Sequence, residues 1–225
     1  MSTRTAIIPY PALTALDIEA RAQACLRRCT EKLDLKELPI PIPVEQWIEG
    51  PLAIRFGVSD LSHLGKDVLG AAFISDGEIL VSETILSNEG RYRFTCAHEL
   101  GHFILHGHLN RAFRDTDVEP GNRSGCESEA DRFAAAFLMP ATLLMREFFD
   151  TCVDRGIDPG RLMVAIMERA TETQTVWKRI MLPAVTRKFS VSLSAAIFRF
   201  RELVLPNGTP FITAGQVAAL LTKQS

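Results

Sequence analysis

Hydrophobic positions near the start of the chain recur with the spacing of an α-helix. Thr14 followed by Asp17 is typical of a helix start. Apolar or small residues then recur every three or four positions to about Lys36: Ile18, Ala22, Cys25, Cys29 and Leu33. We predict a helix with one buried stripe, on which the two cysteines are buried as small hydrophobic residues.

The pattern changes after this helix, where prolines and short β-forming runs replace the helical period. Three prolines in ELPIPIPVEQWIEG remove backbone donors and fix φ, which predicts an extended connector leading into a short helix at about 44–48. The runs LAIRFG, AAFISDG and EILVSE combine β-forming and apolar residues with glycines, and Asp76-Gly77 is a turn signal. We predict three strands that form a small sheet.

Helical patterns dominate the rest of the chain. Apolar positions predict a buried helix from Phe94 to about His106, opened by the polar turn SNEGRYRFT and capped by Gly107. The polar stretch NRAFRDTDVEPGNRSG predicts a loop. A second helix is expected from about Ser124 to Pro140, which can start a third, and further helical segments are expected at 159–171 and 176–203.

Composition narrows the classes of protein that this chain can be. Its 225 residues are 47% hydrophobic, which is ample for a core, and a net charge of -2 excludes a global basic field for nucleic acid. The N-terminus lacks the pattern of a secretory signal, and the longest apolar stretch, 133–145, is shorter than the roughly 20 residues of a membrane span. Five cysteines without a CxxC spacing fit a reducing compartment. We therefore expect a cytoplasmic globular protein with no membrane segment.

The stretch CAHELGHFILHGH carries the candidate chemistry. His98 and His102 are four residues apart, so on a helix they project from one face and can coordinate one ion. Glu99 lies beside that face, where it can take a proton from a water that the metal activates. Imidazole ligands with a carboxylate and an open position suit zinc. We interpret this H-E-x-x-H pattern as a zinc site for hydrolysis; the alternative is a helix with ordinary histidines.

A catalytic zinc needs a third protein ligand, and two candidates compete for this role. His108 would follow an H-E-x-x-H-x-x-G-x-x-H pattern, but Leu105 stands where that pattern has its glycine. The second candidate is a carboxylate from the helix that begins near Ser124. There Glu127 and Asp131 share a face, whereas Glu129 points away from it. We predict that Glu127 is the ligand and that Asp131 accepts the outer N–H of one zinc histidine.

These two segments resemble a known family. RFTCAHELGHFILH followed by ESEADRFAAAFLMP is similar to the ImmA/IrrE-type zinc metallopeptidases, in the pattern R-F-T-x-A-H-E-x-G-H and then E-x-x-A-[ND]-x-F-A with a terminal M-P. The resemblance implies an α+β fold, with a small antiparallel or mixed sheet packed on a helical core that carries the zinc between two helices. It also implies a thermolysin-like ligand set of His, His and Glu, as in gluzincins. We assign 1–150 to this metallopeptidase domain and 151–225 to a helical C-terminal region.

The resemblance also suggests a partner. Members of this family typically cleave or inactivate a helix-turn-helix repressor, so a repressor or antitoxin is the expected protein substrate. In the C-terminal region FSVSLSAAIFRF resembles part of a helix-turn-helix, and four residues give it positive charge: Arg187, Lys188, Arg199 and Arg201. We interpret this segment as a helical appendage that packs on the catalytic domain or binds the partner, in preference to a DNA contact.

The expected reaction is peptide-bond hydrolysis with Glu99 as general base and then proton donor to the leaving amine. A substrate strand is expected to pair with the sheet edge near EILVSE. His106 and His108 receive no role. The competing hypothesis is a zinc-stabilised regulatory module with little or no hydrolysis that contacts DNA through its C-terminal region. An intact Glu99 favours the enzyme, because a purely structural zinc site needs no base.

Overall fold

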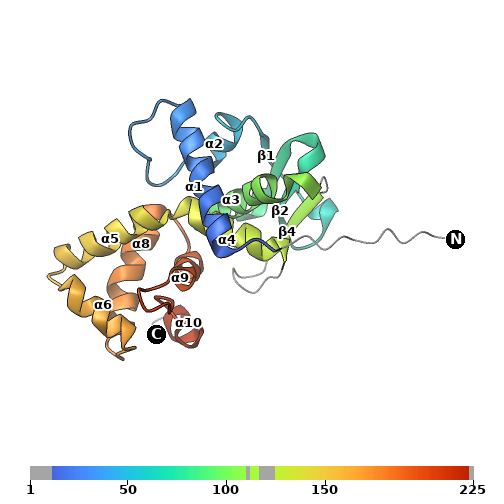
Figure 1. Ribbon diagram of the computed structural model, residues 1–225. Helices are drawn as coiled ribbons and strands as arrows, with labels where there is room; N and C mark the ends of the chain where they lie inside the picture. The colour runs from blue at the N-terminus through green and yellow to red at the C-terminus, as the bar shows by residue number, and fades with distance from the viewer. Residues whose placement is uncertain (1–11, 110–111, 117–124, 223–225) are drawn as a thin grey trace.

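The computed structural model describes residues 12–109, 112–116 and 125–222. A mixed four-stranded sheet lies on one side of the central helices α3 (Glu89–His106) and α4 (Cys126–Leu138), and α1 (Ala15–Lys32) packs against α4 (Figure 1). The helices that follow α4 in the chain gather on the opposite side (Figure 1). The predicted α+β class with a helical C-terminal region is confirmed.

The N-terminal helix α1 begins as predicted and ends earlier. Thr14 and Asp17 form a capping box at its start, and Cys25 and Cys29 are buried on its inner stripe. The helix ends at Lys32, four residues before the predicted end, because Asp34 has a positive φ of 50° that leaves the helical region. Leu33 was predicted to be buried and is 42% exposed, since it is the capping residue beyond the last packed turn.

The three predicted strands and the short helix before them are present. Helix α2 spans Val44–Glu49, and the strands are β1 (Arg55–Ser59), β2 (Val68–Phe73) and β3 (Glu78–Ser82). Gly77 lies in the turn between β2 and β3 and takes the left-handed conformation at φ 64°, which glycine adopts without steric cost. The two strands pair antiparallel. β1 pairs with β3 in parallel. The strands are therefore in the order β1-β3-β2-β4.

The fourth strand corrects the sequence analysis. Strand β4 (Ala112–Thr116) lies within the stretch predicted to be a loop, and it pairs antiparallel with β2. Phe113 of this strand is buried, but most of its neighbours in the sequence are polar. The alternation of apolar and polar residues in this segment was therefore too weak to indicate a strand. The expected substrate edge near EILVSE is also wrong, because β3 is hydrogen-bonded to β1 and β2 on its two sides. Within the described residues, the sheet edge beside α3 is β4.

The helix that carries the histidine motif starts earlier than predicted. Asn88 caps α3 by accepting a hydrogen bond from the backbone of Arg91, so most of the expected polar turn is already helical. At the other end Gly107 is right-handed, at φ -53° and ψ -30°, and the chain continues into a 3-10 turn, Gly107–Leu109. Gly107 is therefore the C-cap of α3, as predicted, although it lacks the left-handed conformation that glycine caps commonly take.

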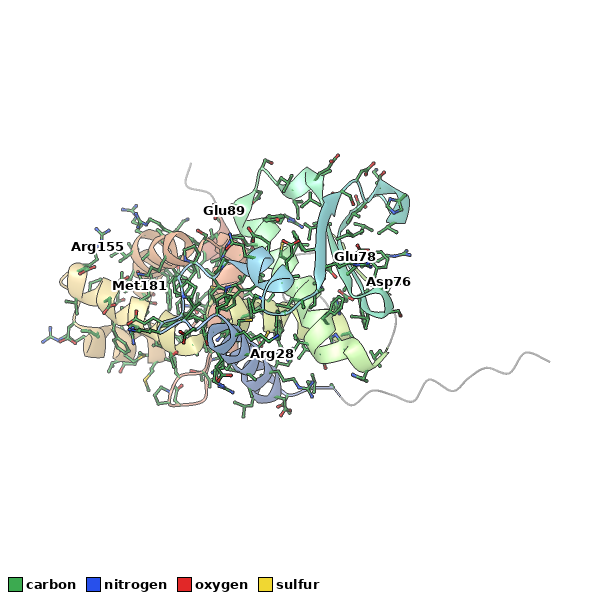
Figure 2. The ribbon with its side chains drawn as sticks, turned by 90° about the horizontal axis from the view of Figure 1, so that it is seen from above. Arg28, Asp76, Glu78, Glu89, Arg155 and Met181 are labelled. Atoms are coloured by element: carbon green, nitrogen blue, oxygen red, sulfur yellow. The ribbon has the colours of Figure 1, made fainter. Side chains whose placement is uncertain are left out.

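The C-terminal region is built from helices. They are α5 (Ala141–Asp154), α6 (Pro159–Met167), α7 (Thr173–Val176), the π-helical segment Trp177–Met181, α8 (Leu182–Phe189), α9 (Leu193–Glu202) and α10 (Ala214–Leu221). The sequence analysis did not predict α10. Arg155, which follows α5, and Glu78 of the sheet lie at opposite ends of the molecule (Figure 2). One continuous cluster of buried apolar side chains joins both parts, and the domain boundary at 150 stays a prediction.

Among the described residues, no single helix has the length and apolar composition of a membrane span. The bent pair Thr173–Phe189 and Leu193–Glu202, at 104° to each other, passes that test jointly, by length and composition alone.

Candidate metal centre

Helix α3 presents the H-E-x-x-H motif to the interior of the protein. His98, Glu99 and His102 are each fully buried, on a helix that packs against α4 on one side and against β2 on the other. The approach of α4 is close, because a Cβ added to Gly101 would lie only 3.2 Å from the Cα of Ala130. This contact between two small residues brings the carboxylates of α4 within reach of the histidines.

Three predicted ligand side chains converge on one point. His98 Nε2 lies 3.1 Å from Glu127 Oε2, His102 Nε2 lies 3.2 Å from His98 Nε2, and the third side of this triangle, from His102 Nε2 to Glu127 Oε2, is 3.5 Å. In a tetrahedral zinc site with bonds of about 2.0–2.1 Å, neighbouring ligand atoms are separated by about 3.3–3.4 Å. The triangle has the size that one such ion requires. In the described part of the chain, this is the group of His, Cys, Asp or Glu side chains that can hold a metal ion.

The protonation of these side chains also suits a cation. Burial lowers the pKa of His102 to about 3, against the opposing effect of its contact with Glu127, so the ring is neutral at pH 7 and keeps a lone pair. Burial raises the pKa of Glu127, but the contacts with His102 and His98 outweigh this and lower it overall. The centre therefore offers a neutral imidazole at His102 and a carboxylate anion at Glu127, which are the protonation states that metal ligation needs.

Asp131 contacts His98 on the ring nitrogen that faces away from the ligand triangle. Its Oδ1 lies 3.0 Å from His98 Nδ1, and both side chains are fully buried. An Nδ1–H that donates to this carboxylate leaves the lone pair of His98 Nε2 pointing into the ligand triangle. Asp131 thus lies where the helical spacing of the sequence predicted it.

Two further residues lie beside this centre without having been assigned a role. His106 is fully buried one turn beyond His102, and its Nδ1 lies 3.0 Å from His102 Nδ1. Its Nε2 lies 2.8 Å from an oxygen of Glu129, which is also buried. Glu129 is outside the ligand group, as predicted, but it faces the protein interior. The H-x-x-x-H-x-x-x-H spacing of α3 was the signal that could have indicated His106.

The other candidate ligand lies elsewhere. His108 is exposed in the 3-10 turn after α3 and does not belong to the ligand triangle. Leu105, which argued against it, is buried on α3, so the helix does not turn back toward the centre at that point.

The predicted base, Glu99, is held close to strand β2. A Cβ added to Gly70 would lie 2.6 Å from Glu99 Oε1 and 2.7 Å from Thr95 Cγ2. Both separations are far shorter than van der Waals contact, so only glycine permits the observed position of this carboxylate. The sequence analysis did not identify Gly70.

This contact makes a prediction about Gly70. In Gly70→Ala the new methyl group should displace the carboxylate of Glu99, whereas the ligand triangle should stay intact, because the atoms nearest to a Cβ at this position belong to Glu99 and Thr95. We expect kcat for peptide hydrolysis to fall about 10- to 100-fold, because displacements of 1 Å in a catalytic group have effects of that size. Metal content should not change. Gly107→Ala is the matched control, since a Cβ at Gly107 meets nothing within 4 Å. An unchanged kcat in Gly70→Ala would contradict this interpretation.

The segment that resembles a helix-turn-helix packs against the start of α3. The guanidinium of Arg93 donates to Ser190 O at 3.1 Å, and a Cβ added to Gly90 would lie 2.6 Å from the backbone nitrogen of Ser192. The turn between α8 and α9 is therefore in direct contact with the helix that carries the metal centre. This favours a packed appendage over a DNA-reading element.

The positive charge of this segment is partly neutralised within the fold. Arg199 is buried and donates to both carboxylate oxygens of Glu19, at 2.8 and 2.9 Å. Lys188 lies 3.9 Å from Glu147. The basic patch that the sequence indicated is thus smaller in the folded protein.

The chain matches one family model and no curated protein. A family model named Peptidase_M78, described as the IrrE N-terminal-like domain, matches residues 52–201, about two thirds of the chain. A search of curated proteins finds no match. The matched range contains the whole ligand triangle, Glu99 and strand β2.

Proposed function

Because the chain belongs to the Peptidase_M78 family, we propose that it is a zinc-dependent endopeptidase that hydrolyses a peptide bond in a regulatory protein. The observation that carries this proposal is the ligand triangle of His98, His102 and Glu127 with Glu99 beside it on α3. Two imidazoles and one carboxylate are the ligand set of hydrolytic zinc sites that leave one position open. A structural zinc site would usually fill that position with a fourth side chain.

The residues of the metal centre would have separate roles in hydrolysis. His98, His102 and Glu127 would hold the ion, and Asp131 orients His98. A bound zinc ion supplies Lewis acidity, which polarises the scissile carbonyl and lowers the pKa of the attacking water. Glu99 takes a proton from this water as the water oxygen bonds to the carbonyl carbon. Glu99 then passes the proton to the amide nitrogen as the C–N bond breaks, which releases an amine and a carboxylic acid, and the acid loses its remaining proton to become a carboxylate.

Strand β4 is the proposed binding edge for the substrate. It is an outer strand among the described residues, and its Phe113 stacks on the ring of His102 with the centroids 4.1 Å apart. An extended peptide can add to such an edge through main-chain hydrogen bonds. A peptide bound there would run next to the ligand triangle.

A helix-turn-helix repressor or antitoxin is the proposed substrate, and the cytoplasm is the proposed compartment. The substrate follows from the resemblance to ImmA/IrrE-type proteins, whose targets are regulators of this kind. The compartment follows from the five cysteines without a CxxC spacing, which fit a reducing environment.

The proposed activity can be tested by removing and restoring the metal. The purified protein is incubated with a proteome-derived peptide mixture and, separately, with a repressor encoded beside it, and new termini are identified by mass spectrometry. We expect cleavage with Zn²⁺, loss of cleavage after chelation, and recovery with Zn²⁺ but not with Mg²⁺, which prefers oxygen ligands. Cleavage that survives chelation, or no new terminus in either substrate with the zinc-loaded protein, would overturn the proposal.

A further inference from the structure

A chain of hydrogen bonds runs from the ligand His102 to the backbone at the start of α1. His102 Nδ1 and His106 Nδ1 are 3.0 Å apart, and His106 Nε2 lies 2.8 Å from Glu129 Oε2. The other carboxylate oxygen of Glu129 accepts the backbone N–H of Leu13 at 2.7 Å. The chain therefore connects α3, α4 and the residue before the first helix cap.

The positions of the atoms allow one consistent set of protons in this chain. His102 Nε2 faces the ligand triangle and must keep its lone pair, so the ring carries its proton on Nδ1. This N–H donates to His106 Nδ1, which then acts as an acceptor. His106 accordingly carries its proton on Nε2 and donates it to Glu129. Each contact in the chain then has one donor and one acceptor.

The surroundings make these hydrogen bonds strong and costly to break. His102 and His106 are fully buried, Glu129 is 5% exposed, and the ring of Phe113 covers both histidines. In such an environment a carboxylate needs donors, and Glu129 receives one on each oxygen. The carboxylate is therefore placed to accept from a neutral histidine and to orient it.

We propose that His106 and Glu129 are positioning residues, which orient His102 for metal binding through this chain and tie Leu13 to the metal centre. His98 is oriented by a carboxylate directly, whereas His102 is oriented by a carboxylate through a second imidazole. The inference rests on the proposed function in one respect, that an ion binds at the ligand triangle. Outer partners of metal-binding histidines commonly contribute 10- to 100-fold to metal affinity.

Two substitutions of His106 separate orientation from packing. His106→Asn can place its Oδ1 near the position of the original Nδ1, so it keeps an acceptor for His102. His106→Phe keeps an aromatic ring under Phe113 and has no acceptor. We expect the affinity for Zn²⁺, measured in the metal-free protein by competition with a chromophoric chelator, to fall roughly 10- to 100-fold in His106→Phe and by less in His106→Asn. A role in packing alone predicts the opposite order.

A second pair of variants tests the far end of the chain and covers the case in which His106→Phe does not fold. Glu129→Gln keeps an acceptor for His106 and should retain more Zn²⁺ affinity than Glu129→Leu, which has none. The Co²⁺-substituted protein should show an altered visible spectrum in Glu129→Leu, since the geometry of the His102 ligand changes. The folded state of each metal-free variant is checked by circular dichroism.

The outcomes distinguish this inference from the proposed function. Tight Zn²⁺ binding by the wild type that His106→Phe and Glu129→Leu leave unchanged would overturn the positioning role alone. Binding that is weaker in His106→Asn than in His106→Phe would do the same. A wild-type protein without Zn²⁺ affinity would overturn the metal centre itself, and the positioning role with it.

Discussion

Replacing Glu99 by glutamine should lower the rate of peptide-bond hydrolysis by about 10²- to 10⁴-fold, the usual contribution of a general acid–base group. Glutamine has nearly the same shape as glutamate but cannot accept the proton from the attacking water. The ligand triangle is formed by other side chains, so Glu99→Gln should bind Zn²⁺ as tightly as the wild type. Single-turnover cleavage of a peptide substrate and zinc content per protein are the two measurements.

Glu89→Gln is the matched control for this change. Glu89 is exposed in the first turn of the same helix, and the substitution makes the same chemical change far from the centre. It should leave both the rate and the zinc content unaltered. Equal cleavage by Glu99→Gln and the wild type would remove Glu99 as the base and, with it, the main argument for an enzyme over a structural metal site.

The second large effect is expected from Glu127→Ala, which should remove most of the bound Zn²⁺. This substitution leaves two imidazoles and takes away the anionic oxygen that lies 3.1 and 3.5 Å from their nitrogens. The loss of affinity should exceed the roughly 10- to 100-fold that an outer partner contributes. Zinc content after gel filtration and chelator competition give the measurement.

Glu129→Ala is the informative comparison, since it makes the same change two residues further along α4. Glu129 reaches the centre only through His106, so its removal should weaken Zn²⁺ binding less than the removal of Glu127. The reverse order would show that Glu129 is the ligand and that the spacing argument selected the wrong glutamate.

The position of α4 explains why so many functional side chains come from one short stretch. Glu127, Glu129 and Asp131 each contact a different histidine or pair of histidines on α3. The two helices can approach because Gly101 and Ala130 meet between them. A larger residue at either position would separate the carboxylates from the imidazoles and should weaken the whole centre at once.

Much of this centre was predictable from the sequence, for a physical reason. The helical repeat converts a spacing of four residues into a shared face, so His98 and His102 had to lie together, as did Glu127 and Asp131. The same repeat with a capping residue indicated α1, the end of the proline-rich connector indicated α2, and β-forming runs with a turn signal indicated the strands β1 to β3. These features depend on residues close to one another in the chain, where local backbone geometry decides what meets.

The remaining features were decided by tertiary contacts. Strand β4 is held in the sheet by Phe113, which is buried against the ring of His102. The sequence of this short segment has no alternating pattern that would predict a strand. Gly70 matters because β2 passes within van der Waals distance of Glu99. Glu129, which a single-helix view places away from Glu127, reaches His106 because α4 is enclosed between α3 and the start of α1. Sequence periodicity determines which side chains share a face of one element, whereas the packing of separate elements decides which faces meet.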